Sequence, residues 1–128
     1  MKPVDGMFKA FADTTRLRIL HLLTRRGLSV CEMMATMGIP QSKISRHLGY
    51  LRASGLVVCR TEGQWRLYTL AKPTTRFQIR ALHCLKDCFD EVAVLRRDLD
   101  RLKVVGPLCA RRKERLAESA RNKRKRPS

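Results

Sequence analysis

This chain of 128 residues has five cysteines, at positions 31, 59, 84, 88 and 109, whose thiols could bind a metal ion or be oxidised. Cys84 and Cys88 are four residues apart, a spacing that places both sulfur atoms on one face of a helix, one turn apart. Two thiolates in that arrangement can chelate one soft metal ion. Cys109, which follows the Gly106-Pro107 break, is a candidate third thiolate. The competing interpretation is that these cysteines are small apolar side chains of the core.

A second group of functional side chains lies between positions 41 and 47. Apolar residues recur at Ile44, Leu48 and Leu51, and this spacing predicts a helix over Gln41 to Ala53. The side chains left outside that apolar face are amides, hydroxyls, cations and an imidazole: Gln41, Ser42, Lys43, Ser45, Arg46 and His47. Such groups hydrogen-bond to base edges and to phosphates. We therefore expect this helix to be the recognition helix of a DNA-binding motif.

The segments before this helix complete a helix-turn-helix pattern. Apolar residues have helical spacing at Val30, Met33, Met34 and Met37. Gly38 is a suitable left-handed C-cap, so a short turn containing glycine joins the two helices. Upstream, the sequence predicts a short helix from Gly6 to Ala12 and a longer one between Asp13 as N-cap and Gly27. The arginines of that longer helix, Arg16, Arg18, Arg25 and Arg26, are expected to face solvent.

From Leu56 the hydrophobic period changes to two. The stretch LVVCRTEGQWRLYTL alternates on both sides of Glu62-Gly63, which predicts a β-hairpin. Arg60, Gln64 and Arg66 lie near its tip and are expected to contact the DNA backbone or the minor groove. A helix-turn-helix followed by a basic hairpin is the winged variant of the motif.

After Pro73 the sequence predicts one long helix, from about Thr75 to Lys103. Its apolar residues have an a/d-like spacing: Leu82, Leu85, Phe89, Val92, Leu99 and Leu102. A helix of about 29 residues would be about 43 Å long, more than a small domain can cover. We expect its surplus apolar seam to pair with a second copy, giving a homodimer whose symmetry matches two half-sites in DNA.

The net charge of the chain also indicates DNA as a partner. The chain has 28 Lys and Arg against 11 Asp and Glu, a formal net charge of +17 that attracts a polyanion. No apolar run approaches the ~18 residues of a membrane span, and the first residues lack a signal-peptide core. The expectations are therefore double-stranded DNA rather than a membrane, a cytoplasmic location and reduced cysteines. The motifs of phosphate-binding loops, zinc proteases and serine hydrolases are absent from the sequence, so we expect neither an enzyme nor an organic cofactor.

The expected fold class is α+β and mainly helical. Residues 1–106 are expected to form a winged helix-turn-helix domain with a two-stranded β-hairpin wing and a long C-terminal dimerisation helix. Residues 107–128 are expected to form a short helix and a basic, disordered tail.

The chain resembles the ArsR (ArsR/SmtB) family of metalloregulatory transcriptional repressors. Four stretches carry the resemblance: FKAFADTTRLRILHLL, LSVCEM, QSKISRHLGYLRASGLV and EGQWRLYTL, which cover most of Phe8 to Leu70. The resemblance implies a dimeric winged-helix repressor that occupies its operator without ligand and leaves when an effector binds. It also implies that the six polar residues between positions 41 and 47 read the operator and that residues 60–66 form the wing.

The effector site departs from the family pattern. Arsenic-sensing relatives often carry C-V-C-[DE]-L with another cysteine three residues beyond, whereas Ser29 and Met34 occupy two of these three thiol positions here. As(III) needs two or three convergent thiolates, so Cys31 alone cannot hold it. The resemblance together with the Cys84 and Cys88 pair therefore predicts As(III), or Sb(III), bound by Cys84, Cys88 and Cys109.

Other functions stay open. His83 with Asp87 partly matches the family's zinc or nickel site on the long helix. A redox- or sulfide-responsive repressor of the same fold would cross-link two cysteines instead of binding a metal. An architectural DNA-binding protein would use charge alone and would have no effector.

Overall fold

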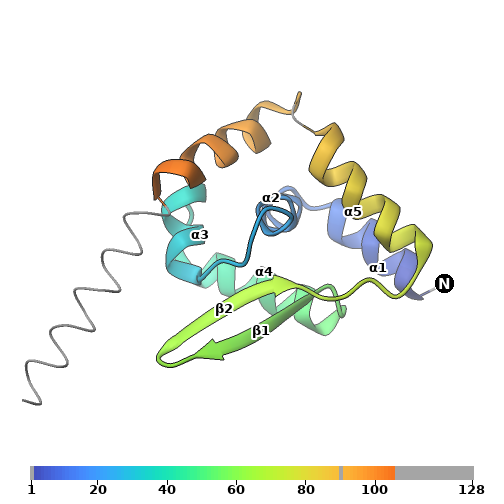
Figure 1. Cartoon of the computed structure of the whole chain (residues 1–128), viewed down its shortest axis with the longest axis horizontal. Helices are drawn as coiled ribbons and strands as arrows, with labels where there is room; N and C mark the ends of the chain where they lie inside the picture. Colours follow the sequence, from blue (N-terminus) through green and yellow to red (C-terminus); the bar gives the residue numbers. More distant parts are fainter. Residues whose placement is uncertain (1, 90, 106–128) are drawn as a thin grey trace, which may run out of the picture.

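The computed structural model describes residues 2–89 and 91–105, which are mainly helical with a single two-stranded antiparallel sheet (Figure 1). The elements are α1 (Lys2–Phe11), α2 (Thr14–Leu23), α3 (Val30–Met37), α4 (Gln41–Ala53), β1 (Val57–Glu62), β2 (Trp65–Leu70) and α5 (Arg76–Cys88). A further helical segment covers residues 93–105. This arrangement confirms the winged helix-turn-helix fold. None of the helices described combines the length and the apolar character that crossing a membrane requires.

The helix-turn-helix begins and ends at the predicted residues. Ser29 caps α3 in a capping box: its hydroxyl accepts the N–H of Glu32, and the carboxylate of Glu32 accepts the N–H of Ser29. At the other end Gly38 has a φ of 69°, in the left-handed region, and its N–H donates to the carbonyl of Met34. Helix α4 then has the predicted bounds, because Ile44 and its apolar partners one turn apart are buried against the core.

The two N-terminal helices differ from their predicted bounds. Helix α1 begins earlier, at Lys2. Helix α2 begins after Asp13, whose carboxylate accepts the N–H of Arg16 at 3.0 Å, as predicted, but it ends at Leu23 rather than at Gly27. The reason is a tertiary contact, since the backbone of Leu28 pairs with Tyr68 of β2 through hydrogen bonds of 3.0 and 2.8 Å. The chain must leave the helix early to reach that strand.

The hairpin pairs β1 and β2 in register from Val57 opposite Leu70 to Glu62 opposite Trp65. Its turn is Gly63-Gln64, one residue later than predicted, and Gly63 has the positive φ, 60°, that a tight hairpin turn favours. The core beneath it is aliphatic and includes these fully buried side chains: Met7, Ile19, Leu20, Leu22, Leu28, Met33, Ile44, Leu48 and Leu51.

The prediction of one helix from Thr75 to Lys103 is wrong. Helix α5 ends at Cys88, the N–H of Val92 donates to the carbonyl of Phe89 at 3.1 Å, and a second helical segment begins at residue 93. In Figure 1 these two helices form an arch around α2. The break between the two helices lets Leu85 and Leu102 of the predicted dimer seam bury in the protomer's own core. Removal of apolar surface from water within one chain thus competes with dimer contacts for the same residues.

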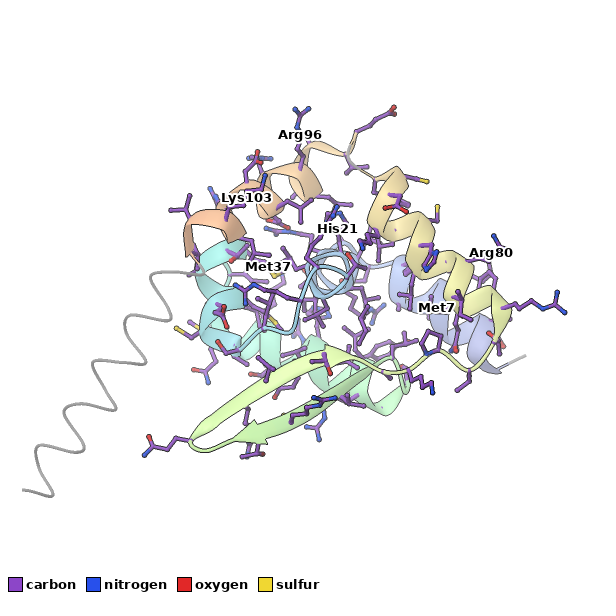
Figure 2. All side chains as sticks on the ribbon, in the orientation of Figure 1. Met7, His21, Met37, Arg80, Arg96 and Lys103 are labelled. Carbon is purple, nitrogen blue, oxygen red and sulfur yellow. The ribbon has the colours of Figure 1, made fainter. Side chains whose placement is uncertain are left out.

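His21 is fully buried on α2, inside this arch (Figure 2). Among the described residues neither ring nitrogen has a hydrogen-bond partner. Burial lowers the pKa of His21 and the charge of Arg25 lowers it further, while Asp98 opposes the shift. The imidazole is therefore neutral at neutral pH.

We expect the free energy of unfolding to fall between pH 7 and pH 5. The unfolded chain, in which a histidine pKa is about 6.5, binds the proton more readily than the folded protein does. Burial of the neutral His21 ring therefore makes its full contribution to the free energy of unfolding above about pH 6.5, the pKa in the unfolded chain. That contribution is lost as the pH falls from this value toward the lower pKa of the folded protein. Urea titrations of wild type and His21→Leu measure this slope.

The pKa of His47 is lowered as well, so His21→Leu should reduce the slope and addition of His47→Gln should remove most of what is left. Asp13, whose pKa is lowered by the N–H of Arg16, acts only below about pH 4. A slope that is the same in His21→Leu and wild type would contradict the assignment.

Candidate nucleic-acid interface and thiol site

The outer face of α4 carries most of the predicted DNA-reading residues. Its apolar face is buried, and this orients five polar side chains to solvent: Gln41, Ser42, Lys43, Ser45 and Arg46. No acidic side chain occurs in this helix, so the face presents two cations together with neutral hydrogen-bonding groups. An exposed helix face of this composition fits the width of the major groove and the acceptors of base edges and phosphates.

His47 lies apart from these five residues. Its side chain is only 11% exposed, and Nδ1 is 3.8 Å from the carboxylate of Asp13 at the start of α2. Burial lowers the pKa of His47, Asp13 opposes this, and the nearby charge of Arg46 lowers the pKa further. A neutral imidazole at the edge of the face would contribute less to any phosphate contact than the two cations would.

Arg16 and Tyr50 form a contact that the sequence analysis missed. The guanidinium carbon of Arg16 lies 4.0 Å from the ring centroid of Tyr50, a cation–π contact that joins α2 to α4. Nη2 of Arg16 also donates to the carbonyl of Lys9 at 2.9 Å. These contacts fix α4 to α1 and α2, and no sequence signal links residues 34 positions apart.

The three wing residues are exposed, but they do not share one face. Strand register places Arg60 opposite Leu67 and Arg66 opposite Thr61. Because cross-strand partners lie on the same face and successive pairs alternate, Arg60 and Arg66 lie on opposite faces of the hairpin. One arginine faces each side, and Gln64 lies in the turn between the strands.

The thiol pair is accessible. Cys84 and Cys88 are both exposed on α5, one turn apart, so neither is a buried core residue. Cys31 on α3 is half-buried. Cys109 lies outside the described residues, and within residues 2–89 and 91–105 no three potential metal ligands form a group. The structure thus places two of the three predicted thiols together, and these could hold part of the coordination sphere of a soft ion.

Ser29, where arsenic-sensing relatives often carry a cysteine, has a structural role. Its hydroxyl caps α3, and the Glu32 carboxylate that completes the capping box is 2.8 Å from the guanidinium of Arg26. The first turn of α3 is therefore held by oxygen and nitrogen contacts.

Comparison with known proteins identifies related regulators. Residues 13–58, from the N-cap of α2 into β1, match the family described as "Bacterial regulatory protein, arsR family". The arsenic resistance transcriptional regulator ArsR1 of Pseudomonas putida is 46% identical over 65 residues, which are 50% of this chain and 51% of that protein. The match therefore spans about half the length of that relative.

Two solved structures extend the likeness. The transcriptional activator HlyU of Vibrio cholerae is 40% identical over 79 residues, which are 62% of this chain and 73% of that protein. Its structure superposes with a TM-score of 0.57 at 38% identity, covering 67% of this chain and 92% of that chain. The transcriptional repressor BigR from Xylella fastidiosa superposes with a TM-score of 0.58 at 26% identity, covering 70% and 84% of the two chains.

Proposed function

Because this chain belongs to the arsR family of bacterial regulatory proteins, which are DNA-binding transcriptional regulators and not enzymes, we propose that it is a dimeric repressor released from its operator by a thiophilic effector. The proposed effector is As(III), or Sb(III), bound by Cys84, Cys88 and Cys109. The observation that carries the proposal is the pair of exposed thiols one helical turn apart on α5.

In the proposed complex α4 of each protomer enters the major groove. Lys43 and Arg46 contact phosphates or guanine edges, while Gln41, Ser42 and Ser45 supply neutral hydrogen bonds. His47 contributes at the edge of the contact, and Arg60, Gln64 and Arg66 belong to the wing. Because cation–phosphate contacts release counterions, the affinity should fall steeply with salt.

An exposed apolar surface on α1 and α5 supports the homodimer. Phe8 is 60% exposed, and its ring lies 5.4 Å from that of Phe77, measured between centroids. Ile79 is also exposed; it is two residues from Phe77 and therefore lies on another side of α5. Large exposed apolar side chains on two adjacent helices favour association with another copy. We propose this surface, rather than the complete seam inferred from the sequence, as the contact between copies.

The variant Phe8→Glu/Ile79→Glu should be monomeric at micromolar concentration. Two carboxylates per protomer would be buried against a second copy without partners, which costs several kcal/mol. Sedimentation velocity of the variant and wild type measures the change. Val58→Glu, which alters an exposed apolar residue on the hairpin, is the matched control and should stay dimeric. A dimer in Phe8→Glu/Ile79→Glu would exclude this surface.

Effector release requires only a modest coupling. A 100-fold loss of operator affinity corresponds to about 2.7 kcal/mol, within the usual range for allosteric proteins. Binding of a pyramidal As(III) ion by thiolates on α5 would stabilise an arrangement of α5 that fits the DNA-bound dimer poorly.

We expect Cys84→Ser/Cys88→Ser to bind the operator with wild-type affinity and to stay bound in arsenite. Fluorescence anisotropy of a labelled duplex from the region upstream of the gene, titrated with arsenite and antimonite, measures release. Cys31→Ser is the matched control and should be released like wild type, because a single thiol beside Ser29 is not a site for As(III). Release of the double variant at wild-type arsenite concentrations would refute the assignment.

A redox-responsive repressor is the second candidate. Exposure of Cys84 and Cys88 makes both thiols accessible to oxidants, and a related solved structure is described as reduced HlyU from Vibrio cholerae. Release of the duplex by peroxide but not by arsenite would favour this function. An effector-free architectural protein would instead bind random and operator duplexes equally.

A further inference from the structure

Arg18 joins the first half of the chain to its C-terminal part. Contrary to the prediction that it faces solvent, its side chain is 14% exposed and forms a bidentate ion pair with Asp98. Nε donates to Oδ2 at 2.8 Å and Nη2 donates to Oδ1 at 2.9 Å. Asp98 is 1% exposed, and the paired hydrogen bonds raise the pKa of Arg18. The pair thus fixes α2 against the helical segment 93–105.

The same guanidinium also holds the end of α3. Nη2 of Arg18 donates to the carbonyl of Met37, the last residue of α3, at 3.0 Å. Nη1 of Arg101 lies 3.6 Å from the position that a Cβ on Gly38 would occupy. Because α3 has no basic residue in its own last turn, these two arginines supply the positive charge that favours a helix C-terminus. Figure 2 shows Met37 beside the helix that carries Lys103.

This contact lies one short turn before the reading helix. Pro40 is the N-cap residue of α4 and makes no side-chain capping hydrogen bond. The position of the start of α4 therefore depends on the preceding turn. Arg18 fixes the beginning of that turn through its hydrogen bond to the carbonyl of Met37. A displacement of Asp98 would release that carbonyl and loosen the connection between α3 and α4.

We propose that Asp98 is a positioning residue for DNA recognition: through Arg18 it fixes the α3–α4 turn and so couples the helical segment 93–105 to α4. The inference rests on the proposed reading role of α4. Stability alone does not require such a pair, since apolar side chains of similar size often replace a buried ion pair without loss. The contribution of the Arg18–Asp98 pair is instead a defined geometry of the turn between α3 and α4.

The test compares wild type with the double variant Arg18→Met/Asp98→Leu. Replacing both charged residues by apolar ones leaves no unpaired charge at the buried site, so the double variant is expected to fold. The readout is the ratio of affinities for the upstream-region duplex and a random duplex of equal length, at one salt concentration and well below the melting temperature. A loss of stability alone does not change this ratio. We expect it to fall about 10-fold in the double variant.

Ile19→Val is the matched control, because it removes one buried methyl group from the adjacent residue of α2 and leaves the ion pair intact. It should keep the wild-type ratio. Arg46→Ala is measured in parallel to test α4 itself. A normal ratio in Arg18→Met/Asp98→Leu with a reduced ratio in Arg46→Ala overturns the coupling alone. A normal ratio in both overturns the proposed reading role of α4 as well.

Discussion

Lys43→Ala/Arg46→Ala should bind the upstream-region duplex about 100-fold more weakly than wild type, a change of about 2.7 kcal/mol. Both side chains are exposed on the face of α4 opposite the core, and both lie in its first two turns. A contact with a guanine edge contributes about 1–3 kcal/mol. Each lost phosphate contact should also reduce the slope of log affinity against log salt by about 0.9. Anisotropy titrations at several KCl concentrations measure both quantities.

The control variant also removes two positive charges, but from residues outside α4. Arg80 and Arg96 are exposed and project away from the body of the molecule in Figure 2. Arg80→Ala/Arg96→Ala should change affinity by less than about threefold, because exposed charges beyond a Debye length are largely screened. Equal losses in the two double variants would mean that net charge, and not the face of α4, drives binding.

Arg18→Met should lower the free energy of unfolding by about 3–5 kcal/mol, since it leaves the buried carboxylate of Asp98 without its partner. That is a large part of the 5–15 kcal/mol typical of a small domain. For a domain of this size the melting temperature should fall by more than about 10 °C. Circular dichroism melts at neutral pH measure the shift.

Two further variants test the cause of that loss. Asp98→Leu in the Arg18→Met background should restore most of the stability, because no buried charge is then unpaired. Arg25→Met changes an exposed arginine just after α2 and should stay within about 0.5 kcal/mol of wild type. A loss below about 1 kcal/mol in Arg18→Met would show that Asp98 is adequately solvated or paired without it.

Local signals predicted the DNA-binding half of the fold well. Asp13 and Gly38 are helix-capping residues whose chemistry acts within one turn, so their positions in the sequence predicted the start of α2 and the end of α3, whereas the capping role of Ser29 was not predicted. Helix α4 was predicted from the helical spacing of its apolar residues, and these residues are buried in the core of the same chain. The DNA-binding residues themselves remain a prediction, although five of the six on α4 are exposed.

The C-terminal half depended on contacts that a sequence does not display. An apolar seam looks the same whether it packs on a second copy or on its own core, so the end of α5 at Cys88 and the burial of Leu85 and Leu102 were missed. The pairing of Arg18 with Asp98 joins residues 80 positions apart.

The capping role of Ser29 has a consequence for the engineering of sensors. A designer who restores the thiol motif of arsenic-sensing relatives by Ser29→Cys would replace the hydroxyl that begins α3 with a poor hydrogen-bond acceptor, at a cost of about 1 kcal/mol. At this position ligand chemistry and folding make opposite demands on one atom. Thiols on α5, such as Cys84 and Cys88, make no such demand on the cap of α3.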